Sequence, residues 1–138
     1  MKLFLLKICY SIEIGAYLAY TGHFAVTGDK EIRRISREEL RHMVLIDRVL
    51  KAYKATPNKL FNTLFLLIGT TVKYSCYISP KIGLNLVASL LEKFNVVSYN
   101  YMADKFPEYK DLFIEMQENE HEHEIYFASL IKGSKHES

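Results

Sequence analysis

The 138-residue sequence predicts an all-α protein made of four long helices and one additional apolar helical segment. Gly and Pro are scarce, at 6 and 3 residues, so few positions interrupt a helix. Long stretches between these interruptions carry apolar residues at helical spacing, and no stretch alternates as a strand would. A chain of this length is expected to form one domain with a single core.

Short segments mark where the helices should begin and end. Asp29 is placed to cap the second helix. Ser79 and Pro80 suit the cap and the first residue of the third long helix. We expect one domain over residues 1–133 and a tail at 134–138. The interruptions are "TGD" at 27–29, "ATPNK" at 55–59, "SPK" at 79–81, "FP" at 106–107, and Gly133.

Polar residues interrupt the apolar faces of the second and the last helix at the same spacing. Glu39 and His42 are three residues apart, as are Glu120 and His123, so each pair shares one helix face. A carboxylate buried without a partner costs several kcal/mol, so each pair should have one. The apolar residues of these faces are Ile32, Ile35, Ile46, Val49 and Tyr53, and Phe113, Met116, Phe127 and Leu130.

The run "ENEHEHE" at 118–124 also admits other interpretations. A run this charged is usually a solvated helix face. Glu118 and His121 offer the same spacing, but their face is less apolar than that of Glu120 and His123. We therefore expect the latter pair to point inward. The residues expected in water are Glu118, Glu122, Glu124, His23 and His136.

Two isolated glutamates complete a repeated pattern. Glu13 precedes Tyr20 by seven residues, and Glu92, the only acidic residue between Asp47 and Asp104, precedes Tyr99 by seven. Each half of the chain then adds one Glu-x-x-His pair. This is the inventory of a carboxylate-bridged di-metal site in a ferritin-like four-helix bundle, and mixed carboxylate and imidazole ligands suit iron or manganese better than zinc. The expected ligands are Glu13, Glu39, His42, Glu92, Glu120 and His123.

The first helix resembles a known family. "EIGAYLAYTGH" at 13–23 is similar to the first-helix signature of the demethoxyubiquinone hydroxylase family, with matches at Glu13, Gly15, Ala16, Tyr20 and Gly22. Further segments that resemble the family are "EELRH" at 38–42, "TPNKL" at 56–60, Glu92 with "YN" at 99–100, and "NEHEHE" at 119–124.

This resemblance implies a membrane-associated di-iron monooxygenase that uses O2 to hydroxylate a polyprenylated benzoquinol ring in ubiquinone biosynthesis. It implies that the six ligands above hold two Fe ions, with Glu39 and Glu120 as bridges. Tyr20 and Tyr99 are candidates for a catalytic role, or for packing with their hydroxyls satisfied nearby. An unidentified electron donor is required, and a homo-oligomer is possible.

The uncharged residues 60–72 form the additional helix between the second and third long helices. As a helix they span roughly 20 Å, short of the roughly 30 Å hydrocarbon core. A buried helix, an interfacial segment that admits an isoprenoid tail, and a span extended past Lys73 all remain open. We expect peripheral attachment through residues 60–78 to the cytoplasmic face of a membrane, the inner membrane in a bacterium.

Other functions fit part of the pattern. A ferritin-like ferroxidase or a rubrerythrin-like peroxide scavenger would use the same ligands, and a structural bundle could bind metal incidentally. Small residues at Gly15 and Ala16 would leave room for a flat ring beside Glu13, which favours the hydroxylase. No nucleic-acid-binding motif is present, and the two cysteines lack the spacing of a zinc site.

Overall fold

The computed structural model describes residues 1–78 and 81–134 and is all-helical over them, with no strand in that part of the chain. This confirms the predicted fold class. The helices are α1 (Lys2–Thr27), α2 (Lys30–Ala52), α3 (Lys59–Ser75), α4 (Lys81–Lys105), the 3-10 helix η1 (Pro107–Tyr109) and α5 (Lys110–Ser134).

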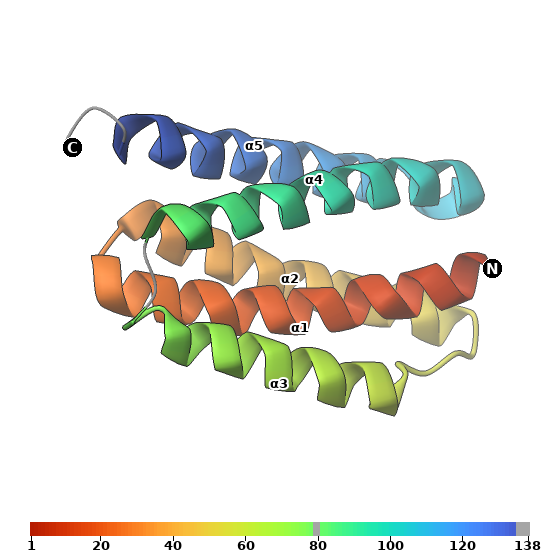
Figure 1. Cartoon of the computed structure of the whole chain (residues 1–138). Coiled ribbons are helices and arrows are strands. Elements are labelled where there is room, and N and C mark those ends of the chain that lie inside the picture. The colour runs from red at the N-terminus through yellow and green to blue at the C-terminus, as the bar shows by residue number, and fades with distance from the viewer. Residues whose placement is uncertain (79–80, 135–138) are drawn as a thin grey trace. The chain divides into compact units, whose positions relative to one another are not determined.

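The helices form two compact units (Figure 1). The first covers Met1–Ile78, in which α1 packs against both α2 and α3. The second covers the described residues 81–134, in which α4 packs against α5. Each unit contains one of the two antiparallel hairpins that the sequence repeat predicts. Their assembly into one four-helix bundle and one domain remains a prediction.

The chain reverses between α1 and α2 in a two-residue turn. Gly28 adopts φ 68°, a left-handed conformation that glycine tolerates, and its N–H donates to the Phe24 carbonyl at 2.7 Å. Asp29 then caps α2 by accepting a hydrogen bond from the Glu31 N–H at 2.9 Å. The predicted cap is confirmed, and the tight turn makes α1 and α2 antiparallel neighbours.

The other interruptions also act as expected. Asn58 caps α3 by accepting from the N–H groups of Leu60 and Phe61 at 3.0 and 3.2 Å. Pro107 begins η1, which separates α4 from α5. The last helix ends one residue beyond Gly133, and the expected roles of Ser79 and Pro80 lie outside the described residues. So do His136 and the tail residues 135–138.

Three glycines allow α3 to approach α1 closely. A Cβ atom added at Gly69 would lie 2.6 Å from the Gly15 carbonyl oxygen, and one at Gly22 would lie 2.6 Å from the Lys73 carbonyl oxygen. One at Gly15 would lie 3.1 Å from the Phe65 carbonyl oxygen. The expectation that Gly15 leaves room for a flat ring is therefore wrong, because the backbone of α3 occupies that space.

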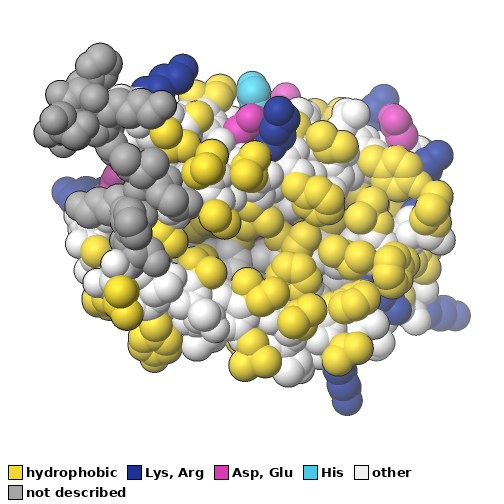
Figure 2. All heavy atoms as spheres, in the orientation of Figure 1, with side chains coloured by type: hydrophobic (Ala, Val, Ile, Leu, Met, Phe, Trp, Pro, Cys, Tyr) yellow, Lys and Arg dark blue, Asp and Glu magenta, His cyan; other side chains and the backbone are white. Residues whose placement is uncertain are grey.

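The additional helix is not a buried core helix. Gly69 is its only buried residue, and Leu60, Leu64 and Leu67 are exposed by 74%, 48% and 61%. Hydrophobic side chains accordingly lie among other groups on the lower part of Figure 2, over α3. Many apolar side chains of α3 are exposed to solvent, so the interpretation as a buried fifth helix is wrong.

One described helix, α1, is long and apolar enough by length and composition to cross a membrane. The core helix of a soluble protein passes the same test, and α1 buries Glu13 and His23 along its length. An apolar helix that could associate with a membrane is thus present at the N-terminus. The spanning alternative for residues 60–78 gains no support, since α3 does not meet the same criteria.

Neither Cys9 nor Cys76 forms a disulfide, and both are buried. The Cys76 thiol lies 3.9 Å from the Ala19 carbonyl oxygen, to which it donates, and burial raises its pKa. A thiol held in its neutral form by apolar surroundings is a poor metal ligand and a poor nucleophile. The cysteines therefore belong to the packing of the first unit.

Candidate metal centre

The first unit brings together three of the predicted ligands. Glu13 lies on α1, and Glu39 and His42 lie one turn apart on α2, where all three are completely buried (0% exposed). His42 Nδ1 lies 3.9 Å from Glu13 Oε1, and one ligand atom from each residue falls within 4.8 Å of the others. Three donor side chains from two antiparallel helices thus lie close together at one point.

The second unit repeats this arrangement. Glu92 on α4 faces Glu120 and His123 on α5, and all three are again completely buried (0% exposed). His123 Nδ1 lies 3.6 Å from Glu92 Oε2 and 4.0 Å from Glu120 Oε2. One ligand atom from each of the three falls within 4.8 Å of the others. We call the two sets the first and second triads.

The charge balance of the interior favours a bound cation. The buried side chains among the described residues include four glutamates and no Lys or Arg, so the only buried side-chain cation available is a protonated imidazole. Ionised carboxylates in such surroundings are costly to bury unless a positive charge accompanies them. A metal ion would balance this charge, and the oxygen and imidazole donors fit iron or manganese.

A buried amide supports the second triad. Asn95 Nδ2 donates a hydrogen bond to Glu120 Oε2 at 3.2 Å, and both side chains are buried. Asn95 Oδ1 has no hydrogen-bond partner among the described residues. Asn95 is not among the predicted site residues, although it follows Glu92 by three positions and so shares its face. The corresponding position after Glu13 is Ala16, so only the second triad has this amide.

The charged run on α5 has the expected register. Glu120 and His123 are buried, whereas Glu118, His121 and Glu122 are exposed. His121 Nδ1 lies 3.4 Å from Glu124 Oε2 on the helix surface.

Two expectations about solvent exposure need correction. The Glu124 side chain is only 25% exposed, so it lies partly rather than fully in water. His23 is buried, at 4% exposure, rather than on the surface. It lies on α1, which packs against helices on two sides and therefore has few exposed positions.

Both candidate catalytic tyrosines are buried. Tyr20 is on α1, and Tyr99 on α4 stacks on Phe113 with ring centroids 6.3 Å apart. This contact accounts for packing at Tyr99, and a catalytic role for either tyrosine remains a prediction.

Comparison with protein-family models, curated proteins and solved structures finds no match for this chain. The resemblance to the hydroxylase family therefore depends on the sequence motifs alone. The fold and the two triads define an all-helical protein with buried carboxylate and histidine clusters that are compatible with metal binding.

Proposed function

We propose that the chain is a di-iron, O2-dependent monooxygenase that hydroxylates a polyprenylated benzoquinol ring in ubiquinone biosynthesis. The observation that carries the proposal is the pair of buried triads, each made of two glutamates and one histidine at matched positions of a repeated hairpin. The motif resemblance supplies the reaction and the substrate class.

The metal assignment requires the two triads to act together. Glu13, Glu39 and His42 would hold two Fe ions jointly with Glu92, Glu120 and His123, and Glu39 and Glu120 would bridge them. Two ferrous ions held by these residues would supply the electrons for O2 activation. Manganese has similar ligand preferences, so metal analysis of the loaded protein decides between iron and manganese.

The protein would hold the ligand side chains rigidly and would exclude water from the metal site. All six ligands lie on long helices, which hold side chains more firmly than loops do. Burial excludes water from the donor atoms and so protects an organic substrate from side reactions. Asn95 orients the Glu120 carboxylate through its hydrogen bond.

The exposed apolar face of α3 supports the proposal that the substrate is a membrane-bound quinol. Leu60, Leu64 and Leu67 project from this helix into solvent, and such a surface suits lipid or an isoprenoid tail. We propose that α3 attaches the protein peripherally to the cytoplasmic face of the membrane from which the quinol is taken.

One observation favours the alternative function, a ferroxidase or peroxide scavenger. The backbone of α3 fills the space beside Gly15, so the expected room for a quinol ring is absent there. A ferroxidase needs no such space. A quinol would have to reach the metal ions by another route.

The test is oxygen consumption, with and without a short-tailed quinol, by protein loaded with two ferrous ions per chain, which supply the two electrons of a single turnover. The proposal predicts that quinol accelerates O2 consumption and yields a hydroxylated ring. Rapid consumption of O2 or peroxide with ferrous iron alone, with quinol left unchanged, would make the alternative function the better one.

A further inference from the structure

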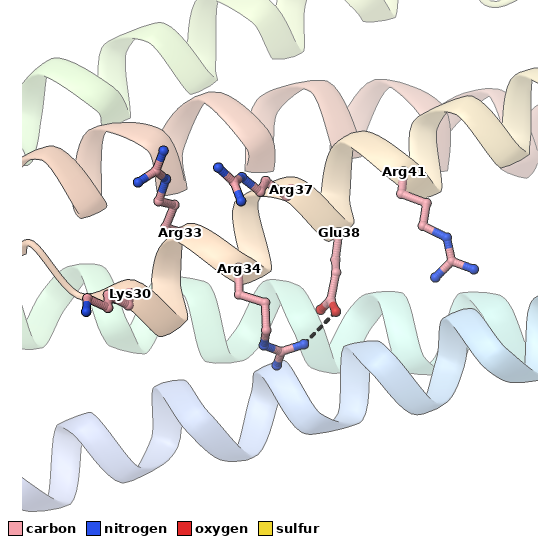
Figure 3. A pocket seen from close by; sticks show the side chains of 6 residues that line it. All are labelled: Lys30, Arg33, Arg34, Arg37, Glu38 and Arg41. Carbon is pink, nitrogen blue, oxygen red and sulfur yellow. Dashed lines mark hydrogen bonds and ion pairs between the residues drawn. The ribbon is translucent and has the colours of Figure 1, made fainter.

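A row of basic side chains lies on α2, outside both triads. Together with Glu38 it surrounds a hollow of about 470 Å³ (Figure 3). A second hollow of about 270 Å³ lies in the groove between α1 and α2. Arg33 and Arg37 border both hollows. The basic residues of the first hollow are Lys30, Arg33, Arg34, Arg37 and Arg41.

The arginines of this row differ in their existing interactions. Arg34 pairs with Glu31 and Glu38, and the hydrogen bond that it donates to Glu31 is the main reason that its pKa is raised. Arg33 lies over the Phe24 ring, 5.2 Å from its centroid. Within residues 1–78 and 81–134, neither Arg33 nor Arg37 forms an ion pair. These two guanidinium groups therefore keep their charge available for a ligand.

The α1–α2 groove has an ordered polar wall. Thr21 Oγ1 donates to the Tyr17 carbonyl at 2.7 Å and lies 3.0 Å from Ser36 Oγ. Phe24 and the Tyr17 side chain add aromatic surface to the same groove. The groove thus combines two arginines, two hydroxyls and two rings within one compact unit.

We propose that this groove binds a phosphate ester of a small molecule, with the phosphate held by Arg33 and Arg37. The two residues are one helical turn apart, about 6 Å along the axis. Two guanidinium forks at that spacing suit a phosphate, which offers three acceptor oxygens, better than a carboxylate, which offers two. The aromatic side chains would lie beside the organic part of the ligand.

The size and position of the groove favour a soluble nucleotide. Small-ligand sites commonly measure about 300–1,000 Å³, and the two adjoining hollows together reach that size. A phospholipid headgroup has the same chemistry. However, α3 exposes more large apolar residues than any other helix of this unit and packs against α1 rather than against the basic helix, whereas α2 exposes only Leu40 and Val44. The proposal does not depend on the proposed hydroxylase function.

The experiment is calorimetric titration of the full chain with ADP, adenosine and pyrophosphate at low salt. We expect saturable binding of ADP, no binding of adenosine, and weaker ADP binding as salt is raised. Arg33→Ala and Arg37→Ala should each weaken ADP binding by about tenfold or more, because each removes a charge-assisted hydrogen bond. The matched control is Arg48→Ala, an exposed arginine of α2 that borders neither hollow, and it should bind as the wild type does.

Vesicles with and without phosphatidic acid identify the source of the phosphate. Vesicle binding that needs phosphatidic acid and is lost in Arg37→Ala, without ADP binding, would support the phosphate site and assign it to a lipid. The proposal is overturned if neither ADP nor phosphatidic acid binds. It is also overturned if Arg48→Ala weakens binding as much as Arg37→Ala, because the effect would then be one of net charge. Far-UV circular dichroism verifies that each variant is folded.

Discussion

At the residue scale, the molecule is defined by carboxylates in places where carboxylates are rarely found. Glu13 and Glu39 share the interior with His42 in the first unit, and the second unit repeats the set. Sequence spacing could predict these residues because the i,i+3 rule assigns Glu and His to one helix face. Spacing also places Asn95 on the face of Glu92, but it could not show that this amide donates to Glu120 on another helix.

Asn95 provides the first prediction. Asn95→Ala should lower the affinity for one of two bound metal ions by about 10–100-fold, because Glu120 loses the donor that orients its carboxylate. The effect is measured by titrating apo protein with Mn²⁺ or Fe²⁺ under anaerobic conditions. Asn100→Ala, an exposed amide on the same helix, is the control. Equal affinities in the Asn95 variant and the wild type would show that the hydrogen bond has no role in metal binding.

The two histidines of the charged run form a matched pair for the second prediction. His123→Ala should abolish binding of at least one metal ion, because it removes a buried imidazole. His121→Ala should leave metal content unchanged, because its ring lies on the helix surface beside Glu124. Metal analysis of the two purified variants decides the question. Loss of metal in the His121 variant alone would reverse the ligand assignment on α5.

At the scale of elements, the contact between α1 and α3 determines much of the first unit. The sequence predicts helix α3 from its apolar run and its break at 55–59, but composition alone does not say which faces are covered. The structure places Gly69 of α3 against Gly15 of α1, and Lys73 of α3 against Gly22 of α1. It leaves Leu60, Leu64 and Leu67 exposed. The same close approach explains why Gly15 does not border a substrate space.

Gly69 provides the third prediction. Gly69→Ala should destabilise the protein by about 1–3 kcal/mol, because the new methyl group would lie 2.6 Å from the Gly15 carbonyl oxygen and force the two backbones apart. Urea-induced unfolding measures the change. Gly133→Ala is the control, since its methyl group meets nothing within 4 Å, and helix propensity predicts an effect between zero and a gain of about 1 kcal/mol. A Gly69 variant as stable as the wild type would mean that α1 and α3 are not in backbone contact.

The exposed face of α3 provides the fourth prediction. Leu67→Asp should reduce binding to lipid vesicles while metal content and folding are retained, because this side chain is 61% exposed and distant in sequence from every proposed ligand. Val44→Asp, at an exposed apolar position of α2, is the control and should bind vesicles normally. Vesicle flotation measures both variants. Unchanged flotation of the Leu67 variant would remove α3 as the attachment surface.

At the scale of the whole molecule, the chain consists of two units that carry equivalent ligand sets. The sequence repeat predicted both hairpins, because Glu13 and Glu92 precede their Glu-x-x-His pairs in the same order. The sequence could not give the packing between the hairpins, which depends on many weak contacts without a short-range pattern. The proposed dinuclear centre would require the two triads to meet, because such a centre draws ligands from all four long helices.

The most direct test of this claim is the iron content and Mössbauer spectrum of anaerobically reconstituted protein, compared with those of Glu39→Ala and Glu92→Ala. These variants remove one carboxylate from each triad. The proposal predicts about two irons per chain in the wild type, present as a coupled pair, and loss of that pair in both variants. Full iron occupancy in both variants, or wild-type protein that binds only isolated single ions, would contradict it.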